Sequence, residues 1–386
     1  MKIITCNRDI PMEFTTDSNL TVQTNLYQKG KYVMSEMLVQ NCLEHYGQQS
    51  IEIIADLMDL PNRYNGQDLT NKKLLCIREG GAGDLLFQTP VYRYLKNKYP
   101  TCEIALSCSP IYHSLFTSNE HISKLFPHIV PYDYFKGYDY FVNFEGLIEG
   151  SKEAEVQNAY DIIFKRFGFP PSLITNKTPV VRVHSLTIEY WMSVLGEQLT
   201  RPKKIGVQLR ASSPIRTPDF DKMGKIIKDL SNKGYTVFLI DSMHRRNFVE
   251  DFIHSHMDGG NENIVNASVY SDSFERMAGI IFLMDMFVGP DSSGTHIAAG
   301  CNKPIVGLYG PFRSHLRLRY YKNAVGIDVV PKRCIQGCFA HTYDICLFAK
   351  ELGDKFAPCW KLLDTNRVIE EVEKLYNRVY DNTGKV

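Results

Sequence analysis

The sequence predicts an α/β protein with two domains, each built around a parallel sheet covered by helices. Apolar runs of strand length alternate with segments of helical spacing, which is the pattern of repeated strand–helix–strand units. The alternation occurs twice, from about residue 73 to residue 179 and again from residue 205 onward. At 386 residues the chain is long enough for two buried cores.

The first predicted domain covers residues 71–200. Strands are expected at 74–77, 103–107 and 140–144, and a helix over 187–198 leads to a basic linker at 200–204. Residues 1–70 precede this domain and carry helical patterns at 32–46 and 51–59. These patterns predict a helical N-terminal extension packed on the first domain.

The second predicted domain covers residues 201–330 and repeats the alternation. Strands are expected at 205–210, 236–241, 286–289 and 305–309. Residues 331–386 follow as a cysteine-rich segment and a final helix over 365–380, which Asp364 or Thr365 can cap.

Composition bounds the class of protein. A hydrophobic content of 44% and a charged content of 23% are those of a globular protein. The net charge of +1 provides no overall basic field that would favour nucleic acid. The first residues lack the apolar stretch of a signal peptide, and no run has the length of a membrane span. The expected location is cytoplasmic, which leaves peripheral membrane contact open.

The loop after the predicted strand 286–289 carries the strongest functional signal. It places hydroxyls and a glycine where a buried strand would turn into a helix. Unpaired N–H groups and the helix dipole attract an anion there, and in a parallel α/β domain that anion is most often a pyrophosphate. The alternative is an ordinary helix start with Asp291 or Ser292 as N-cap. The candidate ligand-binding residues are Asp291, Ser292, Ser293, Gly294, Thr295 and His296.

A second glycine-rich loop follows the strand at 74–77. It reads Arg-Glu-Gly-Gly-Ala-Gly-Asp from Arg78 to Asp84, so that Gly81 and Gly83 are further candidates for contact with a nucleotide. Asp84 stands at the mouth of this loop, where the next helix would begin. Its carboxylate is either a helix cap or a functional base.

Together the two loops resemble motifs of the ADP-heptose:lipopolysaccharide heptosyltransferase family. The family's Arg-x-Gly-x-x-Gly-Asp loop is matched by residues 78–84, and its Gly-x-Asp-Ser-Gly-x-x-His loop by residues 289–296, with one extra residue. Residues 304–311 are similar to the Pro-x-x-x-Leu-[Phe/Tyr]-Gly-Pro run that follows, and 138–147 to a strand that ends in Gln-Gly. The likeness covers roughly residues 72–375.

The resemblance implies a GT-B fold, in which two Rossmann-like domains face each other across a cleft and a last helix commonly crosses back over the junction. It implies an inverting transfer from a nucleotide-sugar co-substrate without a catalytic metal, with Asp84 as general base. Glu145 is the second candidate for the base, or else a hydrogen-bonding contact to the acceptor. The loop at 210–218 is expected to bind the diphosphate through Arg210, Ser212, Ser213 and Arg216.

One departure from the family concerns the cation in that loop. The family usually has a lysine just before an aromatic-Pro pair, and aligning Thr217-Pro218 with that pair puts Ile215 at the lysine position. Either Arg216 or Arg210 replaces the lysine, or the donor differs from ADP-heptose.

Four of the ten cysteines cluster near the C-terminus, as Cys334-x3-Cys338-x7-Cys346-x12-Cys359. Four thiolates in one intracellular segment are able to hold a structural zinc in tetrahedral geometry. The spacing is not the paired Cys-x2-Cys form, so simple packing or adventitious disulfides is the alternative.

Three functions remain open on the sequence. The first is a glycosyltransferase that modifies a glycan such as a lipopolysaccharide core. The second is a transferase of the same fold that acts on another acceptor, including hydroxymethylated bases in DNA, which the near-zero net charge does not support. The third is a nucleotide-binding pseudoenzyme, against which the presence of Asp84 beside both glycine loops argues.

Overall fold

The computed structural model describes residues 1–15, 22–148, 151–257, 261–329, 331, 334, 338, 346–353 and 356–380. The chain forms two compact units. Unit 1 contains Met1–Leu147 and Ile163–Leu173, and unit 2 contains Ile148–Ile162 and Ile174–Val386. This division differs from the predicted boundary at 200/201, because helix α7 (Ser185–Thr200) belongs to unit 2.

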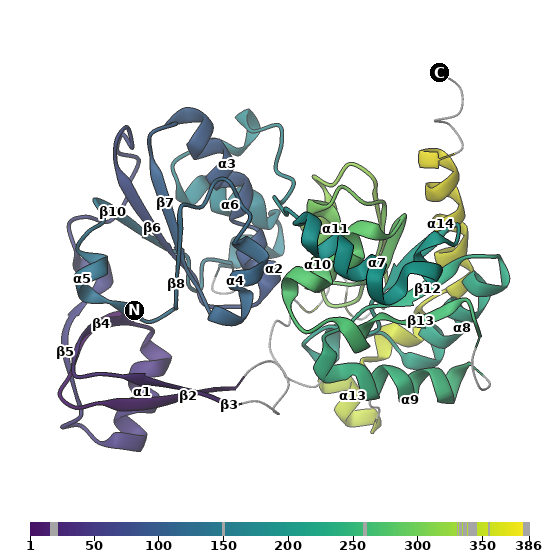
Figure 1. Cartoon of the computed structure of the whole chain (residues 1–386), viewed down its shortest axis with the longest axis horizontal. Coiled ribbons are helices and arrows are strands. Elements are labelled where there is room, and N and C mark those ends of the chain that lie inside the picture. Colours follow the sequence, from purple (N-terminus) through teal and green to yellow (C-terminus); the bar gives the residue numbers. More distant parts are fainter. Residues whose placement is uncertain are drawn as a thin grey trace. The chain divides into compact units, whose positions relative to one another are not determined.

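Unit 1 contains a four-stranded parallel sheet with the order β10-β6-β7-β8. Its strands are β6 (Lys73–Ile77), β7 (Glu103–Ser107), β8 (Lys124–Phe126) and β10 (Tyr140–Asn143). The three strands predicted here are confirmed, and β8 was missed. Helices α2 (Ala82–Leu86) and α3 (Thr89–Lys98) follow β6 directly, as Figure 1 shows. Short helices α4 (His113–Phe116) and α5 (Tyr132–Phe135) complete the set, and the unit boundary divides α6 (Ala159–Arg166) after Ile162.

The prediction of a helical N-terminal extension is wrong for most of its length, because the region is mostly β-structure, but the helix predicted at 32–46 is confirmed over 36–46. Among the described residues it contains a sheet of order β5-β1-β4-β9, a hairpin of β2 and β3, and helix α1 (Glu36–Tyr46). The segment 51–59, expected as a helix, is strand β5 followed by one 3-10 turn, since its β-branched residues pair antiparallel with β1. The strands are β1 (Lys2–Cys6), β2 (Ile10–Thr15), β3 (Val22–Tyr27), β4 (Gly30–Met34), β5 (Ile51–Asp56) and β9 (Val130–Pro131).

The extension shares a core with the parallel sheet of unit 1. Ile3 of β1 and Val33 of β4 are buried in one cluster with Leu75, Ile77 and Phe141 of the sheet. Burial of side chains of this size contributes about 1.5–3 kcal/mol each. The N-terminal residues are therefore an integral part of unit 1.

Unit 2 contains a six-stranded parallel sheet with the order β13-β12-β11-β14-β15-β16. The four predicted strands are confirmed, and the two edge strands were missed. The strands are β11 (Lys204–Val207), β12 (Thr236–Leu239), β13 (Ile264–Asn266), β14 (Met286–Pro290), β15 (Ile305–Tyr309) and β16 (Ala324–Asp328).

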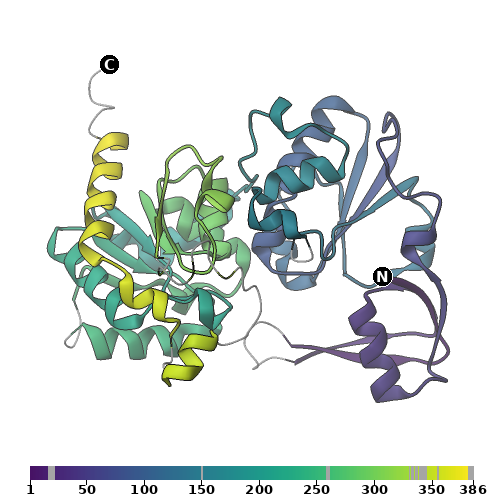
Figure 2. The same cartoon turned by 180° about the vertical axis from the view of Figure 1, so that it is seen from behind.

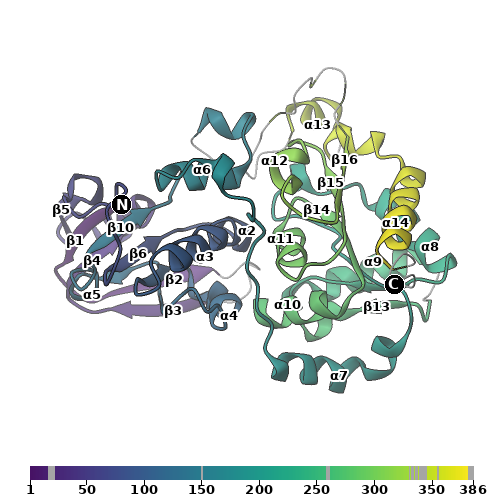
Figure 3. The same ribbon diagram turned by 90° about the horizontal axis from the view of Figure 1, so that it is seen from above.

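Helices cover both faces of this sheet. On one face α8 (Phe220–Asn232), α9 (Arg246–His256) and α14 (Thr365–Tyr380) bury their apolar stripes against the strands. On the other lie α7, α10 (Phe274–Leu283) and α11 (Ser293–Gly300), as Figures 1 and 3 show. The remaining helices are α12 (His315–Leu318) and α13 (Leu347–Leu352).

The predicted final helix is confirmed as α14, and Asp364 Oδ1 caps it by accepting from the backbone N–H of Asn366 at 3.0 Å. All of α14 belongs to unit 2, where it packs against α8 (Figure 2). Lys233, directly after α8, forms an ion pair with Glu373 of α14 at 2.9 Å. Among the residues that the structure describes, no helix has both the length and the apolarity needed to cross a membrane.

Candidate functional site

The strand order of unit 2 reverses between β11 and β14. Counted along the chain, the sheet runs 3-2-1-4-5-6, and β11 and β14 are its first and fourth strands. In open parallel sheets ligands bind outside the carboxyl ends of the strands at this point. The loops that follow these two strands are the two that the sequence predicts to bind a diphosphate. Gln208, just past β11, donates its backbone N–H to Val288 of β14 at 3.0 Å, which keeps the loops side by side.

The loop after β14 leads into α11 with Ser292 at the N-cap position. The Ser292 side chain makes no capping hydrogen bond, because its hydroxyl donates to the side-chain oxygen of Gln208. The predicted alternative of an ordinary Asp or Ser cap is therefore not what the side chains form. Gly294 is required in the first turn of α11, since a Cβ there would overlap Gln208 and Phe287. Thr295 is fully buried and its hydroxyl donates to the Pro290 carbonyl at 2.7 Å, so it stabilises the loop.

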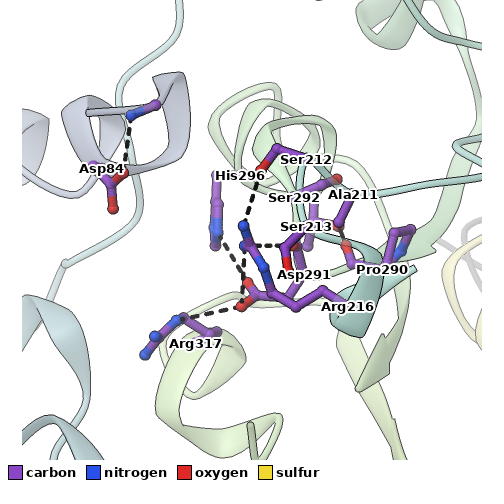
Figure 4. Close-up of polar contacts among 12 residues, drawn as sticks. Asp84, Ala211, Ser212, Ser213, Arg216, Pro290, Asp291, Ser292, His296 and Arg317 are labelled. Atoms are coloured by element: carbon purple, nitrogen blue, oxygen red, sulfur yellow. Dashed lines mark hydrogen bonds and ion pairs between the residues drawn. The ribbon is translucent and has the colours of Figure 1, made fainter. Parts of the chain in front are cut away.

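Asp291 is the buried centre of a charged cluster. Three basic side chains approach its carboxylate: His296 Nε2 at 3.5 Å, Arg216 Nη1 at 3.8 Å and Arg317 Nε at 3.8 Å. Figure 4 shows all three directed toward Asp291. Burial by itself raises the pKa of Asp291, but the hydrogen bond from His296 and the charges of Arg317 and Arg216 outweigh it and hold the pKa well below its ordinary value. Asp291 is therefore ionised, with two permanent cations beside it.

The loop after β11 contributes Arg216 to this cluster. Arg216 also donates through Nη2 to the Ser212 hydroxyl at 2.9 Å, and the buried Ser213 precedes the 3-10 turn Pro214–Arg216. Arg210 lies elsewhere, with its guanidinium 5.6 Å from the centre of the Phe248 ring. Ile215, at the family's lysine position, is buried in the core of unit 2. Of the two arginines proposed to replace the lysine, only Arg216 contacts Asp291.

Sequence reasoning missed Arg317, Gln208 and Tyr321. Arg317 lies in the basic run 313–322, which has the composition of solvated surface, yet its side chain is only 5% exposed. Its guanidinium stacks 4.9 Å from the centre of the Phe312 ring. Tyr321 lies in the same run and contacts His296 through its hydroxyl. No local signal in the sequence distinguishes Arg317 from its exposed neighbour Arg319, because tertiary packing decides which of the two arginines is buried.

Asp84 lies at the start of α2 in unit 1. Gly81 is the N-cap and Asp84 the third helical residue, and the Asp84 carboxylate accepts from the Gly81 N–H at 3.0 Å. Arg78 Nη2 lies 3.6 Å from the other carboxylate oxygen, and the Asp84 side chain is 31% exposed. Gly80 has φ of 134°, a conformation that favours glycine. Asp84 is therefore a capping residue whose carboxylate remains accessible to solvent, and Gly83 lies within the helix.

Glu145 follows β10 in the same unit. Burial and then the negative charge of Glu79 raise the pKa of Glu145 to about 7. Burial likewise raises the pKa of Glu79, and His128 Nε2 lies 3.7 Å from its carboxylate. The carboxyl ends of β6 and β10 thus carry two kinds of acid: the partly exposed Asp84, and the partly buried pair Glu79 and Glu145, whose raised pKa values favour the protonated form.

The four clustered cysteines are reduced and lie among described residues, although much of the segment between them is outside those residues. Cys346 and Cys359 pack against the core of unit 2. Burial, followed by the charges of Cys338 and Cys346, raises the pKa of Cys359 to about 12. Within the described part of the chain, no three His, Cys, Asp or Glu residues are arranged to hold a metal ion.

Comparison with known proteins agrees with this geometry. Residues 175–340, which include both loops of the Asp291 cluster, match the sequence model of glycosyltransferase family 9 (heptosyltransferase). A search among curated proteins finds no match.

Solved structures show the same fold at low identity. ADP-heptose LPS heptosyltransferase II of Escherichia coli is 17% identical, with a TM-score of 0.59 over 80% of this chain and 99% of that one. A family 9 glycosyltransferase from Veillonella parvula is 13% identical, with a TM-score of 0.60 over 81% and 99%. TibC of enterotoxigenic E. coli, a dodecameric iron-containing glycosyltransferase, is 14% identical, with a TM-score of 0.54 over 98% and 92%. The fold is therefore GT-B, and in TibC the likeness extends over nearly all of this chain.

Proposed function

We propose that this chain, a heptosyltransferase-like glycosyltransferase whose residues 175–340 match family 9, moves a sugar from a nucleoside diphosphate donor to an acceptor hydroxyl with inversion. The observation that carries the proposal is the Asp291 cluster at the switch point of unit 2. The likeness of this chain's fold to that of ADP-heptose LPS heptosyltransferase II favours an ADP-heptose-like donor. The proposed acceptor is a glycan such as a lipopolysaccharide core, and DNA is the alternative.

The cluster supports diphosphate binding through its charge balance. Arg216 and Arg317 bring two permanent positive charges, and the ionised Asp291 offsets one of them. The remaining positive charge stands beside the first turn of α11, whose N–H groups have no side-chain cap. A departing diphosphate gains negative charge as the glycosidic bond breaks, and fixed cations that already stand there stabilise that charge. Arg216 takes the part that a lysine has in most of the family.

Asp84 is the proposed base because it is ionisable and accessible. One of its oxygens is engaged by the Gly81 N–H, and the other faces Arg78. In this proposal the Asp84 carboxylate accepts a proton from the acceptor hydroxyl. Glu145, which retains its proton up to about pH 7, is the weaker candidate at neutral pH. We therefore assign Asp84 as base and Glu145 as an acceptor contact.

We propose a metal ion only as a structural element of the protein, not as a participant in the transfer step. The leaving group is proposed to be stabilised by the net positive charge of the cluster and by the N–H groups at the start of α11, so that the transfer step needs no divalent ion. Cys334, Cys338, Cys346 and Cys359 are the residues that would hold a metal. The observation in favour is that Cys338 and Cys346, after burial, contribute to the raised pKa of Cys359, so the three thiols are neighbours. Thiolates suit both zinc and iron, and the likeness to TibC favours iron.

The experiment that tests the donor site is calorimetric titration of the whole protein with ADP, UDP and GDP, using Arg317→Met and Arg319→Met as a matched pair. Arg319 is an exposed arginine two residues from the buried Arg317. We expect one diphosphate to bind, Arg319→Met to leave its affinity unchanged, and Arg317→Met to weaken it about 10- to 100-fold, as for loss of a charged hydrogen-bond partner. Equal binding by both variants, or no binding by the wild type, would remove the donor site from this cluster.

A further inference from the structure

We propose that Tyr321 is a positioning residue of this site: its hydroxyl holds His296 as an uncharged imidazole with the proton on Nε2, directed at Asp291. The geometry stands without the proposed function, which enters only in the consequence for donor binding. Neither residue's partner is apparent from the sequence motif, since Tyr321 lies 25 positions after His296.

A line of buried polar groups runs from α6 to Asp291. The Tyr160 hydroxyl lies 2.8 Å from the Tyr321 hydroxyl, and the Tyr321 hydroxyl lies 2.7 Å from His296 Nδ1. On the other side of the ring, His296 Nε2 lies 3.5 Å from Asp291 Oδ1. All four residues are buried, and Tyr160 and Tyr321 meet edge to face with their ring centres 6.1 Å apart. Water does not compete for these contacts, so each group depends on the next.

The proton positions follow from the acceptor at the end of the line. The ionised carboxylate of Asp291 only accepts, so His296 Nε2 carries a hydrogen toward it. If the imidazole is uncharged, Nδ1 must accept, and the one hydroxyl proton of Tyr321 is donated to it. Tyr160 then donates to the Tyr321 oxygen. Burial raises the pKa of both tyrosines above the usual range, so both keep the protons that this arrangement needs.

The reverse arrangement needs an imidazolium. Nδ1–H would then donate to Tyr321, and Tyr321 to Tyr160. That would place a third positive charge beside Arg216 and Arg317, with the single carboxylate of Asp291 to balance them. An additional buried charge without a partner of opposite sign is costly. The balance of charge around the ring therefore favours its uncharged form, whose tautomer the Tyr321 hydroxyl selects.

The consequence is that Tyr321 acts on the donor through another residue. A ring fixed in one tautomer gives Asp291 one donor at a constant position, and Asp291 in turn orients Arg216 and Arg317. Without the Tyr321 hydroxyl, His296 Nδ1 loses its partner and the ring is free to exchange tautomers or turn. We expect about a tenfold loss in donor affinity, the size that loss of one hydrogen bond in a buried network produces.

Histidine ¹⁵N NMR of the whole protein tests the tautomer, with the His296 signals identified by their loss in His296→Gln. In the wild type at pH 7.5 we expect the pattern of a neutral Nε2–H ring. Tyr321→Phe should shift these signals toward a tautomer average. Tyr320→Phe is the matched control, because the neighbouring Tyr320 hydroxyl donates to Asp161 instead, and it should leave them unchanged. Tyr160→Phe should also preserve the tautomer, since in this arrangement Tyr160 is only a donor to Tyr321.

Imidazolium or Nδ1–H signals in the wild type overturn the proposal, as does a Tyr321→Phe spectrum that matches the wild type. If Tyr321→Phe does not fold, the wild-type and Tyr160→Phe spectra still decide the tautomer. Titration with ADP separates this proposal from the proposed function. An Nε2–H ring in a protein that binds no ADP, UDP or GDP leaves the positioning of His296 intact and removes the donor site.

Discussion

Arg216 reaches Asp291 in two ways: its Nη1 donates to the Asp291 backbone carbonyl at 2.9 Å and lies 3.8 Å from the Asp291 carboxylate. The first contact joins the loop after β11 to the loop after β14, and the second adds a charge to the site. One arginine thus both closes the switch point of the sheet and supplies part of its positive potential. At the same time Nη2 donates to the Ser212 hydroxyl at 2.9 Å, and a lysine has no second nitrogen for this contact.

Replacing Asp291 by Asn should destabilise the protein. The substitution leaves the buried Arg317 and the partly buried Arg216 without their carboxylate, and breaking a buried ion pair typically costs about 3–5 kcal/mol. Urea unfolding at pH 7 measures the loss.

The stability difference between wild type and Asp291→Asn should depend on pH. The pKa of Asp291 is lowered in the folded state, so its contribution is present above the ordinary Asp value near 4 and is lost as the pH falls below it. The stability gap between wild type and Asp291→Asn should therefore narrow as the pH is lowered from 5 toward 2. A gap that stays constant over that range would contradict an ionised Asp291.

Replacing Glu145 by Gln should make the protein more stable than the wild type at neutral pH and above. The pKa of Glu145 is raised from 4.5 to about 7, so wild-type stability falls as the pH rises from about 4.5 through 7, while Gln does not titrate. Each pKa unit corresponds to about 1.4 kcal/mol, so the shift from 4.5 to about 7 makes about 3.5 kcal/mol an upper limit for the effect. Thermal melting at pH 4.5 and pH 8 measures it, with the exposed Glu155→Gln as control. If both variants change equally, Glu145 has no special environment.

Replacing Asp84 by Asn should lower turnover about 10²- to 10⁴-fold, the usual contribution of a general base. Asn retains the size of the side chain and an oxygen that is able to accept from the Gly81 N–H, so folding should be preserved. The affinity for the donor should stay the same, because the proposed donor residues belong to unit 2. Turnover near that of the wild type would reduce Asp84 to a helix cap, and Glu145→Gln would then be the variant to assay.

Chelation should distinguish a structural metal, which we propose, from a catalytic one, which we do not. Turnover should persist when EDTA is added briefly, because the net positive charge of the cluster and the N–H groups at the start of α11 stabilise the leaving group. Elemental analysis should find about one iron or zinc per chain, lost in Cys359→Ser and retained in the matched variant Cys301→Ala. Rapid loss of turnover that Mg²⁺ or Mn²⁺ restores would contradict a metal-free transfer step, and a protein without iron or zinc would contradict the four-cysteine site.

Local pattern in the sequence determined the two parallel sheets and the loops that matter. Strand-length apolar runs such as 205–210 and 286–289 became β11 and β14, because a strand buried on both faces is apolar throughout. The glycine loops follow β6 and β14 as predicted, because a strand-to-helix turn needs small residues and hydroxyls at definite positions. The final helix has the predicted bounds, because both signals that define it are local in the sequence: the capping residue Asp364 and the helical periodicity that follows it directly.

Tertiary structure alone decided what depends on distant partners. Residues 51–56 form a strand because β1, about 50 positions earlier, pairs with them, and local pattern contains no trace of that pairing. Arg317 and Arg319 stand in one basic run, yet packing buries the first beside Asp291 and leaves the second exposed. Tyr321 meets His296 only because α11 and the segment after α12 lie together. Hydrogen bonds and ion pairs between segments depend on distance in space, which the order of residues along the chain does not record.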